Sequence, residues 1–343
     1  MEFPDRNFDL VTLGQVMLRL SPPGKGRIAR SETFEKNVGG AELNVAVGSA
    51  LLGLHTGIIS KLPTHDLGQY MKATIRSYGV SDDFFIYDNS SKARVGVYYY
   101  EYGAYPRKPQ VIYDRQNSSF YSLSIDEINP DVYSNTKCFH TSGITMALSH
   151  TLRDTTIEVI RRFKDAGALI SFDVNYRGNL WSGEEAREAI EKVLPYVDIF
   201  FCSDSTARLT FHKEGTIQEI MKSFTEDYPI RAVFSTQRTV HSPTLHDFGS
   251  YAYCARTGEF FEERPYRNID VVDRIGSGDS YIAGALYGLI SSNGDVQNAV
   301  RYGNATAAMK NTIPGDLPQS NLAEIDSVIA DHYSDGFVSE MKR

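Results

Sequence analysis

Apolar runs and helical patterns alternate along the first part of this chain. Residues 8–14 and 56–60 are short, mostly apolar runs of the kind that form buried strands. Helical patterns follow them, in residues 41–54 and 66–78. A strand–helix–strand–helix order places successive strands parallel to one another, with helices on both faces of the sheet. The alternation therefore predicts an α/β fold with a mostly parallel central sheet.

The same alternation continues through the middle of the chain, where further strands are expected in residues 137–144, 168–177, 199–202 and 231–235. The second of these ends in polar side chains, namely Asp173, Asn175 and Arg177. Ligands of open parallel sheets bind beyond the carboxyl ends of strands, so these residues are predicted to lie near a binding site. His140 lies inside an apolar run. It is either catalytic or a core histidine with a hydrogen-bond partner, and we favour the second interpretation.

Residues 94–121 break this rhythm. Two β-prone runs, 95–102 and 111–115, flank a turn region and predict a hairpin outside the main sheet. Tyrosines occupy both faces of this hairpin, and an isolated two-stranded hairpin cannot bury both faces. We therefore expect it to pack against a second copy of the chain, in a homodimer or a higher homo-oligomer.

Composition limits the class of protein. With 343 residues, 41% of them hydrophobic, the chain is long enough for one large globular domain or two smaller ones. The net charge of −8 argues against a nucleic-acid partner, and an anionic substrate would need a local basic cluster. Three widely spaced cysteines form no Cys-x-x-Cys pair. The sequence contains neither a signal pattern nor an apolar run of the ~20 residues that a membrane span needs. We expect a cytoplasmic protein with no membrane partner.

A glycine-rich turn late in the chain carries the most specific chemistry. Gly276, Ser277 and Gly278 follow an apolar pair, and Asp279 precedes a run of small residues typical of a closely packed helix. Backbone N–H groups at such a turn bind anions, so we interpret these three amides as an anion hole for a transferring phosphoryl group. Asp279 could accept the proton of the attacking hydroxyl. The alternative is an ordinary strand-to-helix turn, because a lone Gly-X-Gly is a weak signal.

A second glycine pair, Gly39 and Gly40, precedes the first helical pattern. Glycine lets a backbone approach a ligand closely, and Asn44 offers an amide in the first helical turns. The alternative is a plain turn before a core helix, since Gly-Gly is a common turn signal.

Together, the two glycine stretches resemble the signatures of a known family. Residues 270–281 resemble the C-terminal signature of the ribokinase-like (PfkB) carbohydrate kinases, and residues 39–46 resemble their N-terminal sugar-binding signature. The resemblance covers nearly the whole chain. It implies one ribokinase-like domain over residues 1–343. This domain would be a three-layer sandwich with a mostly parallel sheet and a small β-sheet lid, formed by residues of about 15–36 and 94–121.

Within this family, residues 140–144, 172–177 and 273–276 resemble the 2-keto-3-deoxygluconate kinases. The resemblance implies ATP-dependent phosphorylation of the terminal hydroxyl of this sugar acid, to give 2-keto-3-deoxy-6-phosphogluconate. Asp279 would be the general base. The substrate pocket would be formed by Gly39, Gly40, Asn44, Tyr98, Tyr113, Arg115, Arg177 and Asp279.

Arg115 and Arg177 favour an acidic substrate, because a carboxylate needs a cation, ideally arginine in bidentate geometry. Either arginine could instead form a surface salt bridge, which would contribute little. Three other functions stay open: a kinase of the fructokinase or ribokinase type for a neutral sugar, a kinase for the epimeric 2-keto-3-deoxygalactonate, and a catalytically silent sugar-acid sensor.

The expected cofactors are ATP and Mg²⁺, and the resemblance leaves open whether a monovalent cation also takes part. Many relatives carry Asn-x-x-Glu where this chain has Ser203 to Thr206, so the glutamate is missing and the metal ligands stay unassigned. Arg238, beyond the strand expected to end at residue 235, could supply positive charge to the ATP phosphates. The full set assigned to ATP is Ser203, Ser235, Arg238, Gly276, Gly278 and Asn304.

Overall fold

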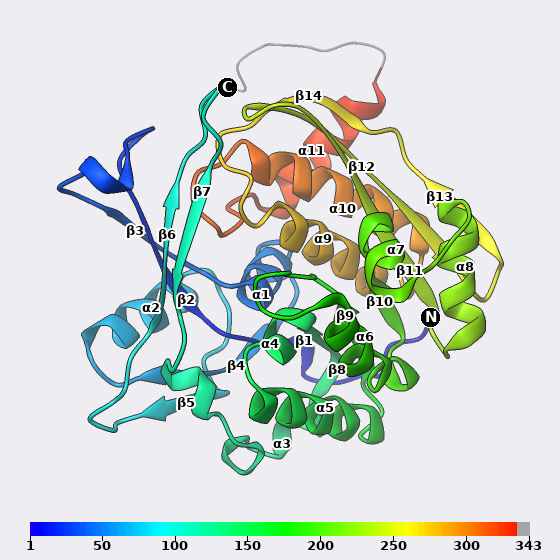
Figure 1. Cartoon of the computed structure of the whole chain (residues 1–343). Coiled ribbons are helices and arrows are strands. Elements are labelled where there is room, and N and C mark those ends of the chain that lie inside the picture. The colour runs from blue at the N-terminus through cyan, green and yellow to red at the C-terminus, as the bar shows by residue number, and fades with distance from the viewer. Residues whose placement is uncertain (335–343) are drawn as a thin grey trace.

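A computed structural model describes residues 1–334, and its centre is a ten-stranded sheet (Figure 1). Seven strands run parallel to their neighbours, in the spatial order β5 (Phe85–Asp88), β4 (Thr56–Pro63), β1 (Phe8–Leu13), β8 (Thr136–Ser142), β9 (Leu169–Asp173), β10 (Ile199–Phe201) and β11 (Ala232–Ser242). Three antiparallel strands complete the edge beyond β11: β12 (Leu245–Cys254), β13 (Glu259–Glu262) and β14 (Tyr266–Asp270). The predicted fold class, α/β with a mostly parallel sheet, is confirmed.

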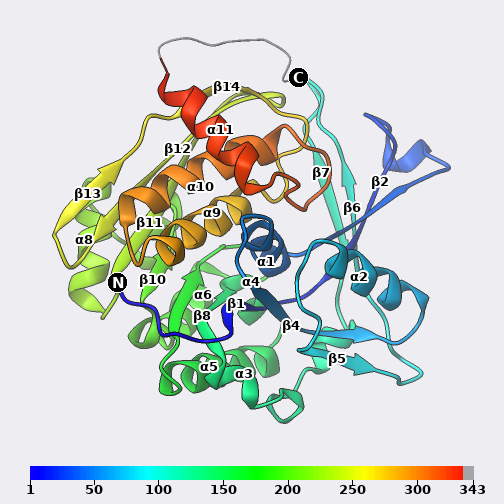
Figure 2. The same ribbon diagram turned by 180° about the vertical axis from the view of Figure 1, so that it is seen from behind.

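Helices cover both faces of this sheet and give three layers (Figures 1 and 2). Neighbouring residues on a strand point to opposite faces, and the core divides accordingly. Val11 packs in the cluster that contains α5 (His150–Asp165), α6 (Gly183–Glu191) and α8 (Ile217–Asp227), whereas Leu10 packs with α1 (Ala41–Leu51), α9 (Ser277–Ser291) and α10 (Val296–Asn311). The other helices are α2 (Asp66–Ser77), α3 (Asp131–Ser134), α4 (Gly143–Ala147), α7 (Asp204–Phe211) and α11 (Leu322–Tyr333).

Local sequence sets several helix starts. The side chain of Ser182 accepts a hydrogen bond from the Glu185 amide, and the Glu185 carboxylate accepts one from the Ser182 amide. This capping box satisfies two amides that the first turn of α6 leaves without an intrahelical partner. Asn321 and Glu324 form the same arrangement at the start of α11. None of the described helices, within residues 1–334, combines the length and apolar character needed to cross a membrane.

A separate four-stranded sheet stands beside the main sheet (Figure 1), and we call it the lid. Its strand order is β3 (Glu35–Gly39), β2 (Met17–Ser21), β6 (Gly96–Glu101) and β7 (Gln110–Asp114). Strands β6 and β7 form the expected hairpin, which lies outside the main sheet as the sequence predicted. All residues of β7 are exposed, so the outer surface of the lid is uncovered in one copy of the chain.

The expectation that a strand ends at residue 235, before Arg238, is wrong. Strand β11 continues to Ser242 because β12 pairs with it antiparallel over almost its whole length, with Arg238 opposite Phe248. Residues 236–242 are mostly polar and exposed, and their sequence alone gives no strand pattern. Pairing with β12 supplies their backbone hydrogen bonds and keeps them in the strand.

His140 lies in the core, as favoured from the sequence. It is buried on β8, and its Nδ1 lies 2.8 Å from Oγ of Ser171. Burial lowers the pKa of His140 to about 3, so the ring stays neutral. The three cysteines are also buried and unpaired with one another.

Candidate active site

A cavity of about 1240 Å³ lies at the carboxyl ends of the parallel strands, where the lid faces the main domain. The ends of β9, β10 and β11 contribute to its lining, together with the first turns of α1 and α9. The structure brings together twelve of the predicted site residues here: Gly40, Asn44, Tyr98, Tyr113, Arg115, Arg177, Ser203, Arg238, Gly276, Ser277, Gly278 and Asp279.

Three predicted site residues do not line this cavity. A Cβ added to Gly39 would lie 1.9 Å from a carboxylate oxygen of Asp316, so this glycine makes room for Asp316. Ser235 is buried within β11. Asn304 is buried on α10, and its Oδ1 accepts a hydrogen bond from Ser250 at 2.7 Å. None of these three residues is in direct contact with the cavity.

The glycine turn at the start of α9 has the geometry of an anion site. Gly276 has a φ of 80°, and a Cβ there would lie 2.2 Å from the Asp316 carbonyl oxygen, so glycine is required. Within residues 1–334, the amides of Gly276 and Gly278 donate to no backbone acceptor outside the helix, so they are free for an anion. The Ser277 amide differs from the prediction, because it donates to the Arg274 carbonyl at 3.3 Å.

Asp279 has the protonation behaviour that a general base at neutral pH requires. Its half-buried carboxyl accepts a hydrogen bond from Nδ2 of Asn44 at 2.7 Å. Removal from bulk water raises the pKa of Asp279 to about 7, against the opposing effects of Asn44 and Arg177. Burial also raises the pKa of Asp173 to about 7, and the negative charge of Asp279 contributes to that shift. The two carboxyls therefore titrate as a coupled pair.

Four arginines face the cavity from different elements: Arg115 after β7, Arg177 after β9, Arg238 on β11 and Arg274 before α9. In the described part of the chain, none of the four has a carboxylate within ion-pair distance. Burial and the positive charge of Arg177 lower the pKa of Arg115, and burial, Arg274 and Arg177 lower the pKa of Arg238. Arg115 and Arg177 therefore do not form the surface salt bridges that were the alternative interpretation. The four arginines share the cavity lining with acidic side chains, among them Glu42, Asp173 and Asp279.

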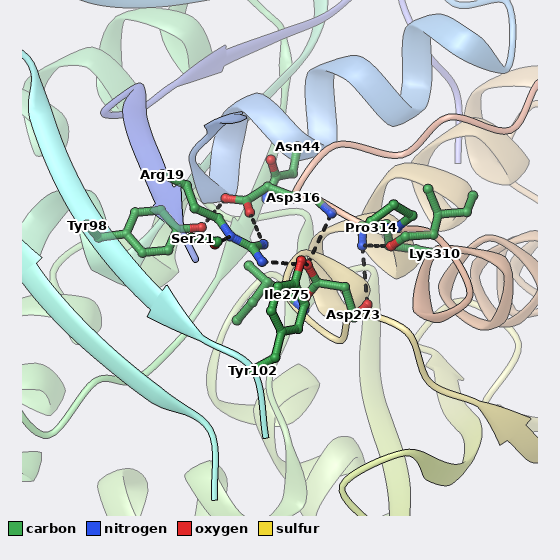
Figure 3. A network of polar contacts seen from close by, with 12 residues as sticks. Arg19, Ser21, Asn44, Tyr98, Tyr102, Asp273, Ile275, Lys310, Pro314 and Asp316 are labelled. Atoms are coloured by element: carbon green, nitrogen blue, oxygen red, sulfur yellow. Dashed lines mark hydrogen bonds and ion pairs between the residues drawn. The ribbon is translucent and has the colours of Figure 1, made fainter. Parts of the chain in front are cut away.

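Behind the cavity lies a buried ion-pair cluster that the sequence did not reveal (Figure 3). The guanidinium of Arg19 lies 2.7 Å from a carboxylate oxygen of Asp273 and 2.7 Å from one of Asp316. The Tyr98 hydroxyl donates to Asp316, and the Tyr102 hydroxyl donates to Asp273 at 3.1 Å. Tyr98 thus lines the cavity with its ring while its hydroxyl is occupied. The one available signal was an arginine at an inward position of an otherwise apolar strand.

The stretch that replaces Asn-x-x-Glu offers no obvious metal ligand. Ser203 caps α7, and Asp204 lies 3.0 Å from Arg208 in an ion pair. Within residues 1–334, no three His, Cys, Asp or Glu side chains are grouped to hold a metal ion. In kinase sites Mg²⁺ is bound by one or two carboxylates together with the phosphates of the nucleotide.

Comparisons with known proteins show similarity to carbohydrate kinases over most of the chain. Residues 7–318 match the model of the pfkB family carbohydrate kinases. A 2-dehydro-3-deoxygalactonokinase of Haloferax volcanii is 36% identical over 321 residues, which cover 94% of this chain and 96% of that protein. A 5-dehydro-2-deoxygluconokinase of Bacillus licheniformis is 28% identical over 335 residues, covering 95% and 97%.

The crystal structure of a 2-dehydro-3-deoxygluconokinase from Thermotoga maritima superposes with a TM-score of 0.89 at 29% identity, covering 94% of this chain and 98% of that one. This fold, the glycine turn with Asp279 at the start of α9, and a family match over most of the chain lead to one conclusion. The chain belongs to the pfkB family of carbohydrate kinases, ATP-using phosphotransferases with an alcohol group as acceptor.

Proposed function

We propose that this kinase phosphorylates the terminal hydroxyl of 2-keto-3-deoxygluconate and forms 2-keto-3-deoxy-6-phosphogluconate. The observation that carries the proposal is the pair Arg115 and Arg177, which face the same cavity as Asp279 and have no carboxylate within ion-pair distance in residues 1–334. A neutral sugar would leave both guanidinium groups without a carboxylate at that distance in the complex. A sugar acid supplies the missing carboxylate, and arginine can bind it through two parallel hydrogen bonds.

Asp279 would remove the proton of the attacking hydroxyl. Its pKa of about 7 lets it be ionised at neutral pH and still accept a proton readily. Asn44 holds this carboxyl through a hydrogen bond from Nδ2 and would thus orient the base.

The phosphoryl group would be held at the start of α9. The free amides of Gly276 and Gly278, with the positive end of the α9 dipole, stabilise the negative charge that develops on the equatorial oxygens. Arg238 and Arg274 face the same cavity and would bind the nucleotide phosphates. Mg²⁺, bound with ATP, neutralises phosphate charge. The lid, with Tyr98 and Tyr113, covers the sugar side and would exclude water as a competing acceptor.

A second substrate, the epimer 2-keto-3-deoxygalactonate, is favoured by one observation: the 2-dehydro-3-deoxygalactonokinase of Haloferax volcanii is 36% identical over nearly the full length. Both epimers carry the same carboxylate for Arg115 and Arg177. They differ at one stereocentre, which changes a hydrogen bond or two.

The test is a coupled ADP-release assay with Mg-ATP. It compares 2-keto-3-deoxygluconate, its galacto epimer, 5-dehydro-2-deoxygluconate, gluconate, fructose and ribose at equal concentration. We expect turnover to be confined to the keto-deoxy acids, with the gluco epimer preferred. Preference for fructose or ribose would contradict the role of the two arginines, and preference for the galacto epimer would replace the first substrate by the second.

We also propose that two copies pack through their lids. Strand β7 is an exposed edge of the lid, and Ile112 is 44% exposed on the face opposite to Val111 and Tyr113, which line the cavity. Surfaces of this kind are unusual on a monomer and become covered in oligomers. Light scattering after size exclusion should give at least a dimer, and Ile112→Glu should reduce the mass to that of one chain. A monomeric wild-type protein would contradict this arrangement. A cytoplasmic location completes the proposal, because free buried thiols suit a reducing compartment.

A further inference from the structure

A lysine that plays no part in the proposed chemistry lies fully buried behind the glycine turn. Lys310, near the end of α10, is 1% exposed. Its Nζ donates to the backbone carbonyl of Asp273 at 3.3 Å and to that of Ile313 at 3.1 Å (Figure 3). Burying an ammonium group is unfavourable unless it is compensated, so this arrangement calls for a reason.

The two acceptors belong to the two loops that form the anion site. Asp273 begins the turn that leads to Gly276, and its carboxylate accepts hydrogen bonds from the amides of Ile275 at 3.0 Å and Gly315 at 3.1 Å. Ile313 begins the loop that leads to Asp316, whose carbonyl packs against Gly276. Lys310 therefore ties together the turn that supplies the amides and the loop that supports it from behind.

The surroundings balance the charge of Lys310. Burial lowers the pKa of Lys310, and attraction to Asp273 and Asp316 opposes that effect. Arg19 bridges the same two carboxylates, so two cations and two anions form a buried set with no net charge. The ammonium group can therefore stay protonated away from bulk water.

A monovalent metal cation does not fit at this position. Such an ion binds backbone carbonyl and carboxylate oxygens, and the carbonyls at the base of the glycine turn already accept hydrogen bonds from the ammonium group. A second cation beside it would meet positive charge and no free oxygen of Asp273, whose carboxylate is fully engaged. Lysine ammonium is a compact point charge, and here it makes the contacts that a bound ion would make.

We propose that Lys310 is a positioning residue that acts as a built-in cation, fixing the anion site so that phosphoryl transfer by this chain needs no monovalent metal ion. The inference rests on the kinase activity of the family and not on which sugar acid is the substrate. It predicts two properties: wild-type activity and stability that do not respond to K⁺, and a response that appears once the ammonium group is removed.

The first experiment uses the wild-type protein. Its kcat with the best accepted sugar, and its melting temperature, are measured in potassium, sodium, ammonium and tetramethylammonium chloride at constant ionic strength. We expect kcat to agree within about twofold across the salts, and the melting temperature to be equal, because an ion that binds only the folded state would raise it. Activation by K⁺ of about tenfold or more, or a K⁺-dependent rise in melting temperature, overturns the proposal.

The second experiment compares Lys310→Met and Lys310→Ala with matched variants of Lys61. Lys61 is also buried and donates to the Ser122 carbonyl at 3.3 Å and to the Glu127 carboxylate at 2.6 Å, neither of which belongs to the two loops of the anion site. We expect Lys310→Met to lower kcat by about 100-fold, the typical effect of disturbing one anion-hole donor, with a much smaller change in KM. Lys61→Met should leave kcat within about threefold of wild type, because its contacts are remote from the turn.

Rescue provides the readout that a merely structural role would not give. Ammonium or methylammonium should restore part of the kcat of Lys310→Ala and raise its melting temperature, while tetramethylammonium, which is too large, should do neither. Lys61→Ala should show no such effect. Normal kcat in Lys310→Met, or no rescue of Lys310→Ala by any small cation, contradicts the proposal. If both Lys310 variants fail to fold, the wild-type salt series decides; if no tested sugar is accepted, the melting temperatures decide, and the failure lies with the substrate assignment.

Discussion

The cavity and the buried cluster behind it contain the same types of side chain and differ in how these are paired. In the cluster, Arg19 is fully buried and lies 2.7 Å from each of two carboxylates. In the cavity, the positive charge of Arg177 contributes to the lowered pKa of Arg115, and neither arginine has a carboxylate within ion-pair distance in residues 1–334. The comparison teaches that the role of an arginine depends on its ion-pair partners and not on the residue type. A paired arginine such as Arg19 stabilises the fold, whereas an unpaired arginine in a cavity is a candidate for binding an anionic ligand.

The largest expected effect tests the cavity, through its proposed general base. Asp279→Asn should lower kcat by about 10²–10⁴-fold, the usual contribution of a general base. The protein should still fold, and at pH 8 it should melt at a higher temperature than wild type. The pKa of Asp279 is raised from 3.8 to about 7 in the folded state, so its ionisation opposes folding above that range.

The measurement pairs steady-state kinetics with thermal unfolding at pH 4 and pH 8. Asp270→Asn, at an exposed position on β14, is the control and should change neither quantity. Near-normal turnover by Asp279→Asn would remove Asp279 from the role of base.

The next effect tests the buried ion-pair cluster behind the cavity. Arg19→Met should reduce the free energy of unfolding by about 3–5 kcal/mol, because the buried carboxylates of Asp273 and Asp316 would lose one of the two cations that balance their charge. The loss should be smaller at pH 5 than at pH 8, since the unpaired carboxyls can take up protons at the lower pH.

Urea unfolding at both pH values checks this expectation. Arg27→Met, which removes an ion pair to Glu101 from a side chain that is 60% exposed, is the control and should change stability by less than about 1 kcal/mol. Equal losses in the two variants would mean that the cluster does not hold the lid to the main domain.

A smaller effect is expected in the cavity itself. Arg177→Ala should raise KM for the sugar acid by about 10–100-fold with little change in kcat, as for the loss of a hydrogen bond to a charged group. Arg187→Ala, which loses only a pair with Glu191 on the surface of α6, is the control. An unchanged KM would place Arg177 with the structural arginines and break the comparison.

The smallest effect is a displacement of the pH profile. For the free enzyme, log(kcat/KM) should rise with pH up to an apparent pKa near 7 and then level off, because Asp279 must be ionised to act as base. Asn44→Ala removes a hydrogen bond that favours the ionised form, so the profile should move to higher pH. Asp173→Asn removes a neighbouring negative charge and should move the profile to lower pH. A profile that stays fixed in both variants would show that another group titrates.

The sequence determined a large share of this protein by itself. The alternation of apolar runs with helical patterns predicted the parallel sheet, because buried strands and amphipathic helices each have a local period. The glycine turn and Asp279 could be found for the same reason, since a tight turn at a helix start is encoded by adjacent residues. The lid hairpin was visible as a break in the alternation.

Only the tertiary structure decided how the remaining residues are paired. Arg19 and Asp316 are 297 positions apart, and no local pattern shows that they meet. The course of β11 through Arg238 depends on β12, and the occupied hydroxyl of Tyr98 depends on Asp316. Lys310 reads in the sequence as an ordinary lysine near a helix end. Its burial follows from which segments the fold brings together, and so does the lack of an ion-pair partner for the arginines of the cavity. The electrostatic energy of each charged group depends on neighbours that are distant along the chain.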